Sequence, residues 1–113
     1  MIMRLWKGKV KAEKAASYLS SLNQTGLKDY AETPGNLAVY SFRRDCGSYE
    51  EFLLLTLWES IAAIKRFAGE EYEKARYYPE DDDFLLEKEP FVDHYEVDYA
   101  VTTLRETERD AAG

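Results

Sequence analysis

The chain has 113 residues, of which 45% are hydrophobic and 14% aromatic, and its formal net charge is −7. This length and composition predict one globular domain whose core is large enough to fold without disulfides. The acidic balance argues against nucleic acid and anionic membranes as partners, because both select basic surfaces, and the single Cys46 excludes an intramolecular disulfide and a multi-cysteine metal site.

The chain begins with a predicted strand over residues 2–10, because apolar side chains occupy both of its faces in alternation. A helix is predicted over residues 11–23, with small and apolar side chains three and four positions apart. The members of this stripe are Ala12, Ala15, Ala16, Leu19 and Leu22. Gly26 interrupts the helix, a further helical turn is expected over residues 27–31, and residues 33–36 form a turn.

A second strand is predicted over residues 37–44 and a third over residues 52–58, joined by a short loop into an antiparallel hairpin. The third strand carries no charge and no alternation of polar and apolar residues. One face takes Phe52, Leu54, Thr56 and Trp58, and the other takes Leu53, Leu55 and Leu57. A strand that is apolar on both faces needs a cover on each. A chain of this length can cover one face with its own helices, so we expect the second cover from another subunit.

Ser60 and Gly69 are the predicted N-cap and C-cap of the next helix. One more short helix is predicted over residues 70–77, with Tyr72, Ala75 and Arg76 facing inward. The last strand is predicted over residues 91–99.

The resulting order is strand, helix, strand, strand, helix, strand over residues 1–100, followed by a polar tail over residues 101–113. This order is typical of the split βαβ, or ferredoxin-like, α+β fold, in which an antiparallel sheet carries helices on one face. Two such sheets packed face to face close into a dimeric α+β barrel. No segment approaches the roughly 18 apolar residues of a membrane span. Basic residues interrupt the apolar N-terminus, so we expect no signal peptide and a cytoplasmic location.

His94 is the only histidine, and histidine is the side chain whose ordinary pKa lies near neutrality. It is therefore a candidate general base or pH switch, with Asp93 and Glu96 close to it in sequence. A single histidine on a strand is more often a structural hydrogen-bonding residue, and both interpretations stay open. Arg4 also has two interpretations: an ion pair across the sheet with Glu96 or Asp98, or a contact with an anionic group of a ligand.

Trp6 and Trp58 each lie on a predicted strand, where they serve either as core residues or as walls of a pocket between sheet and helices. Four aromatic residues of the helical layer would cover the same space, namely Phe67, Tyr72, Tyr77 and Tyr78. An apolar pocket with a few phenol hydroxyls suits a flat aromatic ligand, although an ordinary aromatic core uses the same residues. The acidic residues 80–83 lack the ligand spacing of a calcium loop. We expect no metal site and no cofactor.

The chain resembles the antibiotic biosynthesis monooxygenase superfamily of dimeric α+β barrels over residues 2–99. The segments that carry the resemblance are residues 51–60, Ala63-Ile64, Phe67-Ala68-Gly69, residues 75–81 and residues 94–97. The resemblance implies a homodimer with a pocket between sheet and helices in each subunit. Trp58 matches the superfamily's strand tryptophan beside that pocket.

Haem-degrading members of the superfamily use an asparagine on the first strand, this tryptophan and a histidine on the helical segment. Here Trp6 stands at the asparagine position, and Arg76 or Tyr77 stands where the histidine would be, which departs from that pattern. The quinone-forming monooxygenases use asparagine, tryptophan, tyrosine and arginine. Trp58, Tyr72 or Tyr77, and Arg76 are the counterparts here, and the asparagine has none.

The leading hypothesis is a cofactor-independent monooxygenase that oxidises a small phenolic substrate with dioxygen. Its candidate catalytic residues are His94, Trp58 and Tyr77. The candidate substrate-binding residues are Trp6, Arg4, Phe67, Tyr72, Arg76 and Tyr78. The substrate would form a carbanion or phenolate and pass an electron to dioxygen, with His94 or a tyrosine taking the proton. The alternative is a non-catalytic small-molecule binding or sensing dimer of the same fold, and a haem-binding protein is the third hypothesis.

Overall fold

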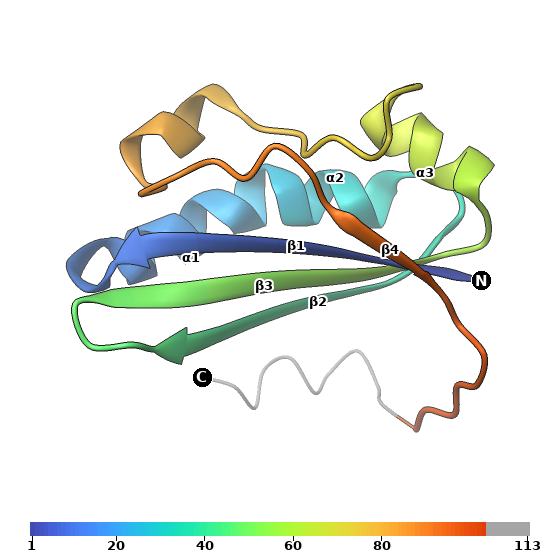
Figure 1. Cartoon of the computed structure of the whole chain (residues 1–113), viewed down its shortest axis with the longest axis horizontal. Helices are drawn as coiled ribbons and strands as arrows, with labels where there is room; N and C mark the ends of the chain where they lie inside the picture. Colours follow the sequence, from blue (N-terminus) through green and yellow to red (C-terminus); the bar gives the residue numbers. More distant parts are fainter. Residues whose placement is uncertain (104–113) are drawn as a thin grey trace.

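Four antiparallel strands form one sheet in the computed structural model, which describes residues 1–103 (Figure 1). The strands are β1 (Ile2–Lys11), β2 (Asn36–Asp45), β3 (Tyr49–Trp58) and β4 (Asp93–Glu96). Their order in the sheet is β2-β3-β1-β4, so β1 and β3 are central. This is the ferredoxin-like α+β arrangement that the order of predicted elements indicated, and that prediction is confirmed.

The helices lie together on one side of the sheet (Figure 1). They are α1 (Ala15–Gln24), α2 (Gly26–Glu32) and α3 (Ile61–Ala68), with short 3-10 helices η1 (Ala12–Lys14) and η2 (Pro79–Asp83). Both predicted caps of α3 are confirmed. Ser60 Oγ accepts a hydrogen bond from the Ala63 N–H at 3.2 Å, and Gly69 ends the helix with a φ of 87°, which other residues rarely adopt. No helix within residues 1–103 is both long and apolar enough to cross a membrane.

The predicted helix over residues 70–77 is wrong, because this stretch is irregular and pairs with a distant part of the chain. Lys74 and Phe91 form an antiparallel bridge. Beside it, the Ala75 N–H donates to the Pro90 carbonyl at 2.9 Å. Backbone groups that a helix would satisfy internally are satisfied here by residues far along the sequence. The segment therefore forms a turn and an irregular stretch held by residues 90–92 instead of a helix.

The last strand is shorter than predicted. Its range is Asp93–Glu96 instead of residues 91–99, and Phe91 belongs to the bridge that precedes it. Of the predicted polar tail, residues 104–113 lie outside the described part of the chain.

The two faces of the sheet differ in their cover. The helix-facing side is buried and carries Arg4, Trp6, Val10, Phe52, Leu54, Thr56 and Trp58. The opposite side, here called the open sheet face, carries Met3, Leu5, Ala38, Tyr40, Phe42, Leu53, Leu55, Leu57 and Tyr95. The three leucines of β3 are only half-buried there, and Phe42 and Tyr95 are 46% and 53% exposed. The chain's helices therefore cover one face of the sheet, as the apolar pattern of β3 predicted.

Trp6 lies along its own strand, directly over Gly8. A Cβ atom added at Gly8 would lie 2.2 Å from Cη2 of the Trp6 ring, closer than any real contact. Because Gly8 has no side chain, the Trp6 indole can occupy the space above it. The orientation of Trp6 above the sheet, which matters for the site described below, depends on the absence of a side chain two residues further on.

We predict that Gly8→Ala destabilises the protein by roughly 1–3 kcal/mol, because the indole must leave its position or the strand must shift. Thermal unfolding followed by circular dichroism and tryptophan fluorescence measures both effects. Gly26→Ala is the matched control, since its added Cβ would meet no atom nearer than 3.8 Å and it lies at the start of α2. Equal stability of the two variants would contradict the role assigned to Gly8.

Candidate functional site

The candidate site is a narrow, partly open space, here called the enclosure, between the helix-facing side of the sheet, helices α1 and α2, and residues 76–81, here called the strap. Its lining residues are Arg4, Trp6, Tyr18, Leu22, Gly26, Tyr30, Leu54, Phe67, Arg76, Tyr77, Tyr78 and Asp81. The free volume is about 20 Å³, which is enough for one water molecule. Aromatic side chains and two guanidinium groups fill the region in which the sequence predicted a pocket.

The indole of Trp6 and the phenol of Tyr77 close one end of this space. Trp6 Nε1 donates to Tyr77 Oη at 3.2 Å, and the two rings meet edge to face with centroids 6.3 Å apart. Tyr77 Oη donates in turn to the Glu89 carbonyl at 2.5 Å. Burial raises the pKa of Tyr77 above its ordinary value of 10.0. The phenol is therefore protonated at neutral pH and acts as a hydrogen-bond donor, not as a base.

Arg4 lies at the centre of the site with only 1% of its surface exposed. Nη1 donates to Tyr30 Oη at 3.1 Å and Nη2 to the Lys74 carbonyl at 3.4 Å, while Nε has no partner. The guanidinium also lies 5.4 Å from the ring centroid of Phe67. Among residues 1–103 no carboxylate forms an ion pair with it.

The predicted ion pair between Arg4 and Glu96 or Asp98 is therefore wrong. The guanidinium lies inside the enclosure, drawn there by a hydroxyl, a carbonyl and an aromatic ring, whereas both acidic residues are exposed to solvent.

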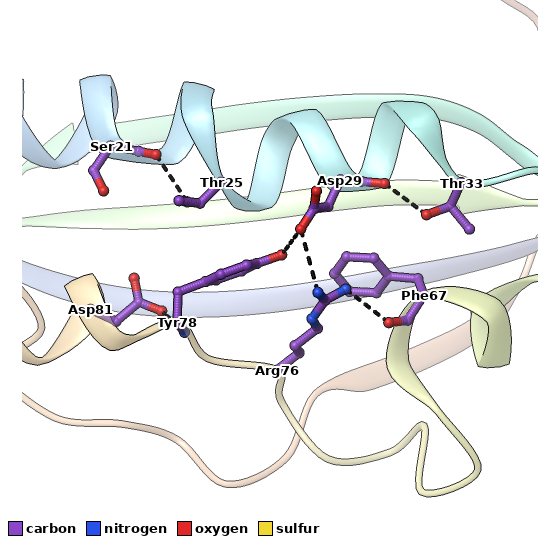
Figure 2. Close-up of polar contacts among 8 residues, drawn as sticks. All are labelled: Ser21, Thr25, Asp29, Thr33, Phe67, Arg76, Tyr78 and Asp81. Carbon is purple, nitrogen blue, oxygen red and sulfur yellow. Dashed lines mark hydrogen bonds and ion pairs between the residues drawn. The ribbon is translucent and has the colours of Figure 1, made fainter.

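Asp29 of α2 binds the strap to the helical layer (Figure 2). Its Oδ2 accepts a hydrogen bond from Tyr78 Oη at 2.5 Å and a second contact from Arg76 Nη2 at 3.4 Å. Arg76 Nη1 also donates to the Phe67 carbonyl at 3.0 Å, and its guanidinium lies over the Phe67 and Tyr78 rings. Burial and the hydrogen bond to Asp29 both raise the pKa of Tyr78. A few polar contacts, most of them partly exposed, thus keep the site closed.

The acidic turn at residues 80–83 has a structural role. Asp81 is buried, and its Oδ2 accepts the Tyr78 N–H at 2.8 Å, which caps η2 (Figure 2). Burial raises the pKa of this carboxyl group above its ordinary value. Asp82 forms an ion pair with Lys88. Within the described residues no group of three or more His, Cys, Asp or Glu side chains is placed to hold a metal ion.

His94 and Tyr72 form a pair beside Arg4, outside the lining of the enclosure. The rings meet edge to face at 5.2 Å, and His94 on β4 is the register partner of Arg4 on β1. His94 Nε2 is buried and has no hydrogen-bond partner. Burial and then the nearby Arg4 cation lower the pKa of His94 below 6.5, against weaker opposing effects of Glu73 and Asp93. The imidazole is neutral at physiological pH, which is the state a general base requires.

Trp58 lies one layer behind the site. It is fully buried, donates from Nε1 to Thr56 Oγ1 at 2.8 Å, and packs against Tyr30 and Phe67. Of the nine predicted site residues, six therefore line the enclosure, namely Arg4, Trp6, Phe67, Arg76, Tyr77 and Tyr78. His94 and Tyr72 flank it, and Trp58 supports it.

The residues of the site with polar side chains that were not predicted as site residues from the sequence are Tyr18, Asp29, Tyr30 and Asp81. The helical spacing of the sequence could have identified Tyr18, because Ala15, Tyr18 and Leu22 lie on one face of α1. These three residues are buried, while Ala12 and Ala16 are exposed. Asp29 and Tyr30 have no local signal, since their partners Tyr78 and Arg4 lie far away in the sequence. Asp81 instead accepts from Tyr78, only three residues away, and caps η2.

Comparisons with solved structures identify the fold. A point mutant of MhuD, crystallised with two manganese protoporphyrin IX molecules per active site, has a TM-score of 0.59 and 18% identity, over 90% of this chain and 99% of that one. A candidate antibiotic biosynthesis monooxygenase from Bacillus cereus has a TM-score of 0.57 and 17% identity, over 90% and 97%. A third structure, of the same description and from Nitrosomonas europaea, has a TM-score of 0.58 and 17% identity, over 88% and 100%.

The chain thus has the fold of the antibiotic biosynthesis monooxygenase structures, as the resemblance in sequence predicted. No protein-family model matches the chain, and no curated protein matches it in sequence. Structural similarity at such a low sequence identity establishes the fold alone. The activity has to be argued from the residues of the site.

We predict that the stability of the protein falls as the pH is lowered from about 7.5 to about 5.5, because the unfolded chain binds a proton at His94 before the folded chain does. His94→Gln removes this titration and should flatten the curve in this window. The measurement is the free energy of unfolding in urea at several pH values. The raised pKa of Asp81 changes the free energy of unfolding with pH in the opposite direction. Because Asp81 is present in both proteins, its effect cancels when the two curves are compared. Parallel curves for both proteins would contradict the pKa direction given for His94.

Proposed function

We propose that the protein is a cofactor-independent monooxygenase that converts a small phenolic substrate to a quinone with dioxygen. The observation that carries the proposal is a neutral imidazole, His94, placed opposite a buried cation, Arg4, at the edge of an aromatic enclosure. A base beside a fixed positive charge is suited to take the proton of a phenol and to stabilise the phenolate. The shared fold with monooxygenase structures supports the same class of reaction.

The reaction balances without a cofactor. The phenol gives its hydroxyl proton to His94, and a ring carbon of the phenolate passes an electron to dioxygen and then forms a C–O bond. The peroxide formed in this way takes the proton back from His94. The O–O bond of the resulting hydroperoxide breaks as the proton on that ring carbon leaves, which releases water and the quinone. One phenol and one dioxygen thus give one quinone and one water. Trp6 and Phe67 would hold the ring, and Trp58 would keep Phe67 in place.

Substrate entry requires the strap to move, because the enclosure has room for only one water molecule. The contacts of Asp29 with Tyr78 and Arg76 are the ones that must open. Tyr77 would then contribute a hydrogen-bond donor, since its raised pKa keeps its proton in place.

The second candidate function is a binding or sensing module without turnover. It is favoured by the filled enclosure and by the tyrosine hydroxyls, whose protons are already committed to Glu89 and Asp29. A ligand that binds in the micromolar range and is recovered unchanged would distinguish this function from the first. A haem-binding role, the third hypothesis, is the least favoured, because the sole histidine lies on β4 and not on the helical segment.

The activity is tested by aerobic incubation with 1-naphthol in an oxygen electrode, without flavin and with a chelator present. We expect one dioxygen consumed per quinone formed, and a decrease in kcat of about 10²- to 10⁴-fold in His94→Gln, the range typical of a general base. Trp58→Phe tests the supporting role, and the exposed Lys28→Gln on α2 is the control. Full activity in both site variants would show that these roles are assigned wrongly. No oxygen uptake by the wild type would remove the monooxygenase proposal.

The proposal includes a homodimer formed through the open sheet face. The apolar side chains of β3 on that face have no cover from the helices, and two such faces packed together would bury them. Leu55 lies at the middle of this face, opposite Leu5 and Tyr40.

We expect Leu55→Glu to convert a dimer into a monomer, because it places a charge where apolar contact is needed. Sedimentation velocity over a range of concentrations measures the change. Ala16→Glu adds the same charge on the exposed side of α1 and should leave the dimer intact. A wild-type chain that is monomeric at all concentrations would refute the proposed dimer and would say nothing about the monooxygenase activity.

A further inference from the structure

Two buried side-chain atoms within residues 1–103 have no hydrogen-bond partner, and they are Arg4 Nε and His94 Nε2. Their residues are opposed in the register of β1 and β4. The side chains of such a pair start about 5 Å apart on the same face of the sheet. Buried polar atoms are nearly always satisfied, so two neighbouring exceptions mark one place where partners are missing.

The charge of Arg4 is also uncompensated. Its contacts are a hydroxyl of Tyr30, a backbone carbonyl of Lys74 and the ring of Phe67, all of them neutral. An arginine cannot relieve its burial by losing a proton, as a lysine does. A buried cation without an anion is strongly unfavourable. The fold keeps it in spite of this cost, which is typical of a group retained for binding.

We propose that Arg4 and His94 together bind an aromatic hydroxy acid whose carboxylate and hydroxyl are on adjacent ring carbons. The carboxylate accepts a hydrogen bond from Arg4 Nε–H and supplies the missing negative charge. The hydroxyl donates to His94 Nε2, and the ring lies against the aromatic lining once the strap has moved to make room for it. The inference rests on the proposed function, in which this hydroxyl is the group that loses its proton to His94.

Simpler ligands complete only half of the site. A phenol satisfies the imidazole and leaves the cation unpaired, and an aromatic acid without a hydroxyl does the reverse. We expect a ligand with the two groups far apart on the ring to reach only one of the two atoms, since the side chains start about 5 Å apart on directly opposed residues. The two unsatisfied atoms thus favour a ligand whose carboxylate and hydroxyl groups are adjacent.

The selection is tested by calorimetric titration of the full chain with 1-hydroxy-2-naphthoate, 1-naphthol, 2-naphthoate and 6-hydroxy-2-naphthoate. We expect the first to bind on the order of 10- to 100-fold more tightly than each of the others, as hydrogen bonds to charged groups provide. Equal affinities for 1-hydroxy-2-naphthoate and 1-naphthol would overturn the inference. So would equal affinities for the two hydroxynaphthoates, since these differ only in the spacing of the two groups.

A double variant separates binding from stability. Arg4→Met combined with Tyr30→Phe removes the cation together with the hydroxyl that it contacts, so the Lys74 carbonyl is the one hydrogen-bond partner of Arg4 that stays without its donor. If Arg4 is retained for the ligand, the unliganded variant melts at or above the wild-type temperature and loses its preference for the hydroxy acid over 1-naphthol. Arg44→Met, an exposed arginine at the end of β2, is the control and keeps that preference. A melting temperature lower by more than about 5 °C would assign Arg4 a structural role and refute the inference.

The two proposals fail separately. Tight binding of 1-hydroxy-2-naphthoate without oxygen uptake supports the hydroxy-acid site and removes the monooxygenase. Oxygen uptake with 1-naphthol at the same kcat/KM as with the hydroxy acid supports the monooxygenase and removes the carboxylate subsite.

Discussion

The structure depends on the burial of one face of the sheet by a thin and partly irregular layer. Strand β3 places Phe52, Leu54, Thr56 and Trp58 against that layer, and β1 adds Arg4 and Trp6. Helices cover much of this face, and the strap covers the space that Arg4 and Trp6 line; the only regular part of the strap is the beginning of η2. Because the strap is fixed through a small number of side chains, the part of the core beneath it is also the part that can open.

The site combines an apolar enclosure with charges that such an enclosure disfavours. The Arg76 cation has Asp29 as its partner, whereas the Arg4 cation has only neutral contacts. The same low-dielectric surroundings keep the tyrosines protonated and His94 neutral, since burial penalises the charged form of each. One physical cause thus accounts for the protonation states, for the instability of an unpaired cation and for the attraction of the site to an anion.

The fold and the side chains that fill its interior are set by different residues. The sheet and helices follow the geometry of the antibiotic biosynthesis monooxygenase structures, while the space between them is occupied by Trp6, Tyr30 and Tyr77. Trp6 in particular needs Gly8 beside it, so its position is a property of two residues and not of the fold. The architecture is set by backbone pairing and apolar burial, and the chemistry is set by the few side chains that project into the enclosure.

The sequence by itself determined the order of the elements, the caps of α3 and the imbalance between the two sheet faces. Each of these follows from spacing within a short window, because the periods of helix and strand are local. The tertiary structure alone decided the rest. Residues 70–77 have a helical pattern but pair with Pro90 and Phe91, Arg4 lies away from Glu96, and Asp29 meets Tyr78 from another part of the chain. These contacts join residues far apart in sequence, and their partners are chosen by which side chains the folded sheet brings within reach, which no local pattern records.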